Sequence, residues 1–208
     1  MNWNAIKVRS LLLPLLIAPM LLWAQSSQET PESKTKTNKN LAIEIRKLEI
    51  TTEKTPAAKG SQKGSRGSGA RWLCVRGQIN ISDQQWLDEI DARWSVLVDT
   101  GSKSKPILMQ LSTKFVNLEK GKNYITAFVN PNFFKRHLDT EKVSTSKVSA
   151  RLEIAVNGKV VARKQEGGKA GLIATPGKCS IDKSSLVPRS KTPFADVDFD
   201  HYANEKAD

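Results

Sequence analysis

The sequence predicts an all-β protein built as an antiparallel β-sandwich of about seven to eight strands, with a flexible N-terminal leader and a C-terminal tail. Short segments alternate apolar and polar residues, turn-forming residues separate them, and no long segment has helical periodicity. A closed all-β barrel is the alternative that fits the same pattern. The alternating segments lie at 73–81, 94–98, 107–111, 124–129 and 148–156.

The first strand is predicted at 41–50, before the main series. Its apolar residues alternate up to Ile45 and then continue out of phase from Leu48, which indicates a β-bulge near Arg46–Lys47. An amphipathic helix is the alternative, but the Ile and Thr residues favour a strand. A linker rich in Gly, Ser and Lys follows at 56–69.

Several irregular positions are predicted inside the main series. Gly77 indicates a bulge or a close approach of another segment. Residues 82–90 predict a short helical turn or an irregular loop, and 119–122 predict a turn. A single helical turn is expected at 132–138.

The segment 148–156 has the clearest strand pattern in the chain. Asn157-Gly158 follows it and predicts a tight hairpin, because both turn residues of such a hairpin need positive φ. A last strand is expected within 170–178, and the polar tail begins at Ser180.

Residues 1–24 predict a signal peptide that is cleaved between Ala24 and Gln25. Lys7 and Arg9 precede a short apolar run that ends in a small residue, as in secretory signals. A membrane anchor is the alternative, but a spanning helix needs about 20 apolar residues, and this run is shorter and holds two prolines. We therefore expect an exported protein of the periplasm, the outer membrane surface or the extracellular space, with no transmembrane span in the mature chain.

The sequence thus divides into four predicted parts: the signal peptide (1–24), a polar leader with one strand-like segment and the linker (25–70), a β-sandwich domain (71–185) and a C-terminal tail (186–208).

The charge of the chain is strongly positive. Its 208 residues include 33 Lys and Arg against 21 Asp and Glu, a net charge of +12, which becomes +10 without Lys7 and Arg9. Residues 71–185 hold nineteen basic and eleven acidic residues, a net charge of +8. This charge suits an anionic glycan, mucin or lipid surface, although a solvated basic surface is the plainer interpretation. Nucleic acid is not expected, because no RNA-binding motif with interleaved aromatic residues is present.

Cys74 and Cys179 predict one disulfide, because exported proteins fold in an oxidising compartment. Such a bridge would stabilise the fold by about 4–5 kcal/mol. Two separate thiols are the alternative. No Cys-x-x-Cys pair is present, so redox catalysis is not expected.

We find no catalytic pattern in the sequence. The two histidines, His137 and His201, lack zinc-binding spacing, and no nucleophile elbow or phosphate-binding loop is present. Trp86 and Tyr124 could stack on a sugar ring, but packing within the protein is the simpler use of both. The sequence therefore predicts a non-enzymatic protein with no catalytic residues, no metal site and no cofactor.

The tail contains apolar residues spaced among acids, and we predict them to be partner-docking residues: Phe194, Val197, Phe199 and Tyr202. The segment is apolar enough to dock on its own domain or on a neighbour. Together with the strand at 41–50, it suggests assembly by strand addition between subunits, with docking on the chain's own domain as the alternative.

Four short segments resemble a known group of proteins: Trp72-Leu-Cys-Val-Arg-Gly77, Trp86-Leu-Asp-Glu-Ile90, Arg93-Trp94 and Arg189-Ser-Lys-Thr-Pro-Phe-Ala195. They are similar to pilus-associated, immunoglobulin-like exported proteins of Akkermansia and related Verrucomicrobia. The resemblance covers Arg71 to about Tyr202. It implies an immunoglobulin-like β-sandwich, an extracytoplasmic location and a role in pilus-like assembly, and it implies no catalytic residues.

We therefore expect a non-enzymatic structural or interaction protein of the cell surface or periplasm, associated with a pilus-like assembly. Its expected partners are other envelope or pilus-like proteins, or further copies of itself. A binding module for anionic surfaces is the alternative function.

Overall fold

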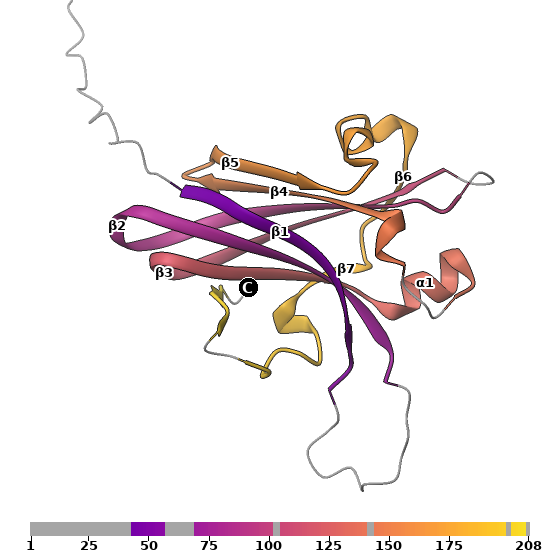
Figure 1. Cartoon of the computed structure of the whole chain (residues 1–208), viewed down its shortest axis with the longest axis horizontal. Coiled ribbons are helices and arrows are strands. Elements are labelled where there is room, and N and C mark those ends of the chain that lie inside the picture. The colour runs from indigo at the N-terminus through magenta and orange to yellow at the C-terminus, as the bar shows by residue number, and fades with distance from the viewer. Residues whose placement is uncertain (1–42, 57–68, 102–104, 141–143, 199–200, 207–208) are drawn as a thin grey trace, which may run out of the picture. The chain divides into compact units, whose positions relative to one another are not determined.

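The computed structural model describes residues 43–56, 69–101, 105–140, 144–198 and 201–206. Eight strands form one hydrogen-bonded sheet in the order β5-β4-β2-β3-β6, with β1 added to β2 and with β7 and β8 added to β3 (Figure 1). All the pairs are antiparallel except β3 with β6. The elements are β1 (Ile43–Lys54), β2 (Arg71–Val98), β3 (Ile107–Val129), α1 (Pro131–Leu138), η1 (Thr145–Lys147), β4 (Val148–Val156), β5 (Lys159–Glu166), η2 (Ala170–Ala174), η3 (Pro176–Lys178), β6 (Ser180–Asp182), β7 (Leu186–Pro188), η4 (Arg189–Lys191) and β8 (Asn204–Glu205).

The all-β antiparallel class is confirmed, but the strands are longer than expected. β2 has 28 residues and β3 has 23, and they pair along almost their whole length. The predicted helical turn or loop at 82–90 is wrong, because β2 runs through it with a register shift between Ile81 and Trp86. The predicted turn at 119–122 is also strand, and Gly121 absorbs the bend with φ of 102°.

β2 and β3 form one long hairpin that bends near Gly121, and the bend brings the two ends of this hairpin face to face. The first part of β2 pairs with β1, and its last part pairs with β4 along the same edge. One hydrophobic core fills the space between them and includes Leu73 and Val75 from the first part and Trp94 and Val96 from the last. Strands that pass between layers at a bend produce such a core without two separate sheets. The two separate sheets of an immunoglobulin-like sandwich are therefore not seen in the described residues.

Three local predictions are confirmed. The register of β1 against β2 shifts between Ile45 and Lys47, at the predicted bulge. Asn157 and Gly158 have φ of 51° and 77° and join β4 to β5. The helical turn expected at 132–138 is α1, which begins where the Asn130 side chain accepts a hydrogen bond from the backbone N–H of Asn132.

The strand predicted within 170–178 is wrong. This segment forms the short helices η2 and η3 instead. Pro176 lacks the backbone N–H that a strand ladder needs, and Gly177 has no side chain to pack against a neighbouring strand.

The predicted disulfide between Cys74 and Cys179 is not present in the structure. Cys74 pairs with Phe128 near the open end of the β2–β3 hairpin. Cys179 directly precedes β6, which pairs with Ile107 at the closed end of that hairpin. The two cysteines pack in different apolar clusters, so the fold keeps their sulfur atoms apart.

The predicted signal peptide, its cleavage point at Ala24 and Gln25, and the leader up to residue 42 lie outside the described residues. Within the described ranges, none of the helices has the length and hydropathy needed to cross a bilayer.

The two faces of the bent sheet approach each other closely at Gly77. A Cβ atom at this position would lie 2.5 Å from Cδ2 of Leu152 and 3.3 Å from Cγ1 of Ile125. Both side chains are fully buried. The close approach predicted from the sequence is thus confirmed, and the absence of a side chain at Gly77 lets the faces meet.

We expect Gly77→Ala to destabilise the fold by about 1–3 kcal/mol, because overpacked cores must shift side chains or backbone. The measurement is urea unfolding, with Gly168→Ala as the control, since a Cβ there meets nothing within 4 Å. The double variant Gly77→Ala, Leu152→Ala should lose less free energy of unfolding than the two single variants lose when their losses are added. Equal stability of wild type and Gly77→Ala would contradict the close approach.

Candidate functional site

The predicted docking residues lie in a C-terminal strap, defined here as residues 186–198 and 201–206. The strap packs on its own domain along the edge of β3 that faces away from β2. β7 pairs with Ala127–Val129, and β8 pairs with Phe115 and Val116. Of the two alternatives for the tail, the structure shows docking within the chain.

Phe194 anchors the strap. It is 5% exposed and lies against Phe128, with stacked rings 4.8 Å apart, and against the edge of Trp72 at 6.0 Å. Cys74 is buried in the same cluster, and burial raises the pKa of its thiol. The other predicted residues differ from Phe194: Val197 is 38% exposed, and Phe199 lies outside the described residues.

Tyr202 joins the strap to the body through two arginines. Its hydroxyl accepts a hydrogen bond of 2.7 Å from Arg76, which also donates to Glu53 at 3.1 Å. The guanidinium of the buried Arg189 lies 4.5 Å from the centre of the Tyr202 ring and donates to the carbonyl of Val197. Burial raises the pKa of Tyr202, so the phenol stays neutral and remains an acceptor for Arg76.

Two more contacts close the strap. The Glu205 carboxylate accepts hydrogen bonds of 2.9 Å from the backbone N–H groups of Arg189 and Ser190. His201 stacks on Tyr124 with ring centres 4.4 Å apart, so this face of Tyr124 is covered. Trp86, the other aromatic residue considered for sugar stacking, is 53% exposed.

The strap leaves part of the β3 edge open. β6 covers Ile107–Met109 and β8 covers Phe115 and Val116, but within the described ranges no strand pairs with the stretch between them on that side. The carbonyl of Lys114 faces outward, because it accepts from the backbone N–H of Lys206. By the two-residue period of a strand, the backbone groups of Ser112 and Gln110 also face outward.

A cavity of about 720 Å³ lies beside this open edge, and residues of both β3 and the strap line it: Asp91, Leu111, Ser112, Thr113, Lys114, Pro188, Ser190, Lys191, Glu205 and Lys206. Thr113 is buried, and its hydroxyl has no hydrogen-bond partner among the described residues. The open edge therefore has space next to it and unused hydrogen-bonding groups within it.

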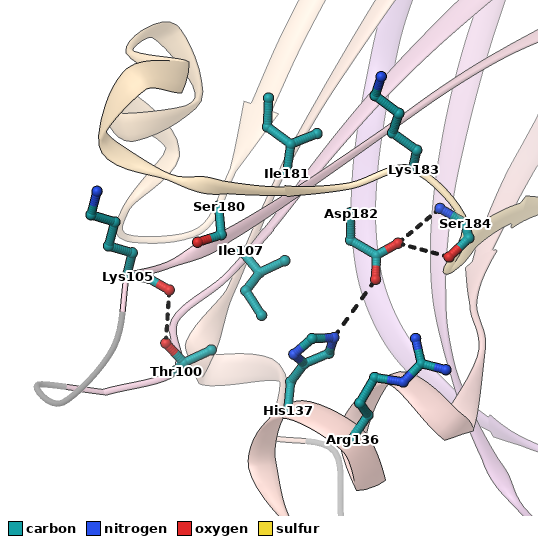
Figure 2. A pocket seen from close by; sticks show the side chains of 10 residues that line it. All are labelled: Thr100, Lys105, Ile107, Arg136, His137, Ser180, Ile181, Asp182, Lys183 and Ser184. Carbon is teal, nitrogen blue, oxygen red and sulfur yellow. Dashed lines mark hydrogen bonds and ion pairs between the residues drawn. The ribbon is translucent and has the colours of Figure 1, made fainter.

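A second cleft lies at the closed end of the β2–β3 hairpin, between α1 and β6 (Figure 2). Its centre is Asp182, which accepts from the backbone N–H and hydroxyl groups of Ser184 and Ser185 at 2.8–3.1 Å. Its Oδ2 lies 3.8 Å from Nε2 of His137. Partial burial raises the pKa of Asp182, but these hydrogen bonds outweigh it and hold the pKa below its usual value.

The sequence analysis found no zinc-binding spacing around His137 and did not single out Asp182. The link between them depends on β6 lying beside the end of β3, which no local pattern indicates. In the part of the chain that the structure describes, no three His, Cys, Asp or Glu side chains gather in a group that could hold a metal ion.

We expect Phe194→Ala to loosen the strap and expose Cys74. Removing a buried Phe ring costs about 3–5 kcal/mol in well-packed cores, so the thiol should react at least about tenfold faster. The measurement is labelling with a thiol reagent in a Cys179→Ser background. Val197→Ala is the matched control, because its side chain is already exposed. Equal labelling of all three proteins would contradict the docked strap.

We expect Asp182→Asn to lower stability at neutral pH but not in acid. A carboxylate with a lowered pKa stabilises the fold above its unfolded value of about 3.9, and this contribution is lost as the pH falls through the folded value. Urea midpoints measured at pH 7 and near pH 2 test this. A difference between variant and wild type that is the same at both pH values would contradict the charged role of Asp182.

Comparisons with known proteins agree with this fold. None of the curated proteins matches the chain. A crystal structure of a protein from Akkermansia muciniphila matches with a TM-score of 0.67 and 20% sequence identity, over 81% of this chain and 94% of that one. At this identity the match shows a shared fold alone. A protein-family model matches residues 34–208, which is most of the chain. The chain therefore belongs to the family that this model describes.

Proposed function

We propose that this chain is a non-enzymatic interaction protein of the cell envelope, associated with a pilus-like assembly. The open stretch of the β3 edge at residues 110–113 carries the proposal, because the outward carbonyl of Lys114 is already bonded to Lys206. Membership of the family, the fold shared with the Akkermansia muciniphila protein and the resemblance of four sequence segments support it. The partners are other envelope or pilus-like proteins, or further copies of the chain.

An extended segment of a partner fits the open edge as an added strand. Unpaired N–H and C=O groups on an edge strand are a template for such pairing. The outward groups of Gln110 and Ser112 would supply the hydrogen bonds, and the neighbouring cavity gives room for the partner's side chains. The stretch is short, so this pairing alone gives modest affinity, and neighbouring contacts must add to it.

The strap shapes this edge. Lys206 forms an ion pair of 2.6 Å with Glu89, which also pairs with Lys114 at 2.5 Å. These contacts hold the end of the strap beside the open stretch, so the strap forms one wall of the cavity. In this proposal the tail acts by framing a docking edge rather than by binding a partner with Phe194.

Export is part of the proposal. The sequence features of residues 1–24 support cleavage between Ala24 and Gln25. The mature chain then consists of the leader and linker around β1, the sheet domain and the strap. It acts in the periplasm, on the outer membrane surface or outside the cell.

A second copy of the chain is the first partner to test. Two copies can pair antiparallel through the same edge about a two-fold axis at Ser112, which places the outward backbone groups of the two Ser112 residues opposite each other. Ser112→Pro removes an outward N–H without breaking the ladder to β2. Ser112→Ala keeps that N–H and is the matched control.

We expect the mature chain and Ser112→Ala to gain mass with concentration in light scattering, whereas Ser112→Pro stays monomeric. Circular dichroism and urea unfolding check that all three proteins are folded. Association that survives in Ser112→Pro would remove the β3 edge from the proposal. Three monomers at high concentration would leave other envelope proteins as the partners and exclude a second copy.

A further inference from the structure

Two neighbouring cavities lie at the C-terminal end of α1, and together they are called the trough here. The cleft of Figure 2 has a volume of about 570 Å³, and the second cavity has a volume of about 590 Å³. They share Thr100, Arg136 and His137 in their linings. Small ligands typically occupy cavities of about 300–1,000 Å³, so each cavity has room for one or two sugar rings.

Basic residues outnumber acidic residues in the lining of the trough. Its charged residues are four bases and two acids, a net charge of +2 with His137 neutral: Lys105, Arg136, Lys147, Lys183, Asp139 and Asp182. The bases come from four separate segments of the chain. Figure 2 shows Lys105, Arg136 and Lys183 around the cleft, with His137 pointing toward Asp182.

These cations differ from three others on the domain that form ion pairs. Lys114, Lys169 and Arg163 each contact a carboxylate at 2.5–2.7 Å. Among the described residues, Lys105, Arg136 and Lys183 have no carboxylate within ion-pair distance. Asp182 lies between them, but Ser184 and Ser185 already occupy its oxygens. The trough therefore presents positive charge that the protein itself does not neutralise.

We propose that this trough binds an anionic polysaccharide through the carboxylate or sulfate groups on its sugar rings. Lys105, Arg136 and Lys183 would contact the acid groups. The hydroxyl of Ser180 and the 54% exposed side chain of Ile181 suit the hydroxyls and the C–H face of a sugar ring. Among the described residues, no Trp, Tyr or Phe lines the cleft of Figure 2, and Phe134, which lines the second cavity, is only 1% exposed. The trough therefore offers single-stranded nucleic acid no large aromatic face for stacking. This site is separate from the β3 edge and does not depend on it.

The test is a binding titration of the mature chain with polygalacturonate, which carries only carboxylates, and with dextran sulfate, which carries only sulfates. The triple variant Lys105→Gln, Arg136→Gln, Lys183→Gln should lose about tenfold or more in affinity for the polymer that binds, from three lost contacts of modest strength each. Affinity of the wild type should fall as salt rises.

The matched control removes the same charge elsewhere, with Lys54→Gln, Lys120→Gln and Lys159→Gln at exposed positions on three strands. It should change affinity by less than about threefold, since it alters only the long-range field. Ser112→Pro should bind like the wild type, which separates this site from the docking edge. Equal losses in the two triple variants, no binding of either polysaccharide, or tighter binding of a single-stranded oligonucleotide of equal charge would each overturn the proposal.

Discussion

The contact of Gly77 with Leu152 and Trp94 is the constraint on which the rest of the structure depends. It exists because β2 and β3 bend together instead of ending, so one hairpin supplies both faces of the core. β1 pairs with the first part of β2, and β4 pairs with its last part along the same edge. The bend then places β1 and β4 on opposite sides of the core. A side chain at position 77 would push apart the faces that bury most of the apolar residues of the domain.

The position of β3 follows from this arrangement. β3 pairs with β2 along one edge, so the backbone groups of its other edge need partners. Three short strands, β6, β8 and β7, pair with that edge. Phe194 and Tyr202 hold the strap, which includes β7 and β8, in place through an aromatic cluster and a pair of arginines. The strap therefore solves the exposed-edge problem only in part, and the part that it leaves open is the surface available for another chain.

The β3 edge and the basic trough use different physical interactions. Backbone hydrogen bonds at the edge accept almost any extended segment, so specificity there must come from the strap and the cavity beside it. The trough selects by charge. Because the trough lies at the closed end of the hairpin and the open edge lies further along β3, one molecule can in principle hold an anionic polymer and a protein partner together.

The sequence by itself determined the features that depend on a few neighbouring residues. The all-β class, the bulge at Arg46–Lys47, the Asn157–Gly158 turn and the helical turn at 132–138 follow from side-chain periodicity and from local φ preferences. Only the tertiary structure decided the continuity of β2 through 82–90, the separation of Cys74 from Cys179, and the meeting of Asp182 with His137. Each of these depends on which distant strand lies alongside, and a pattern of alternating residues specifies a face to bury but not the partner that buries it.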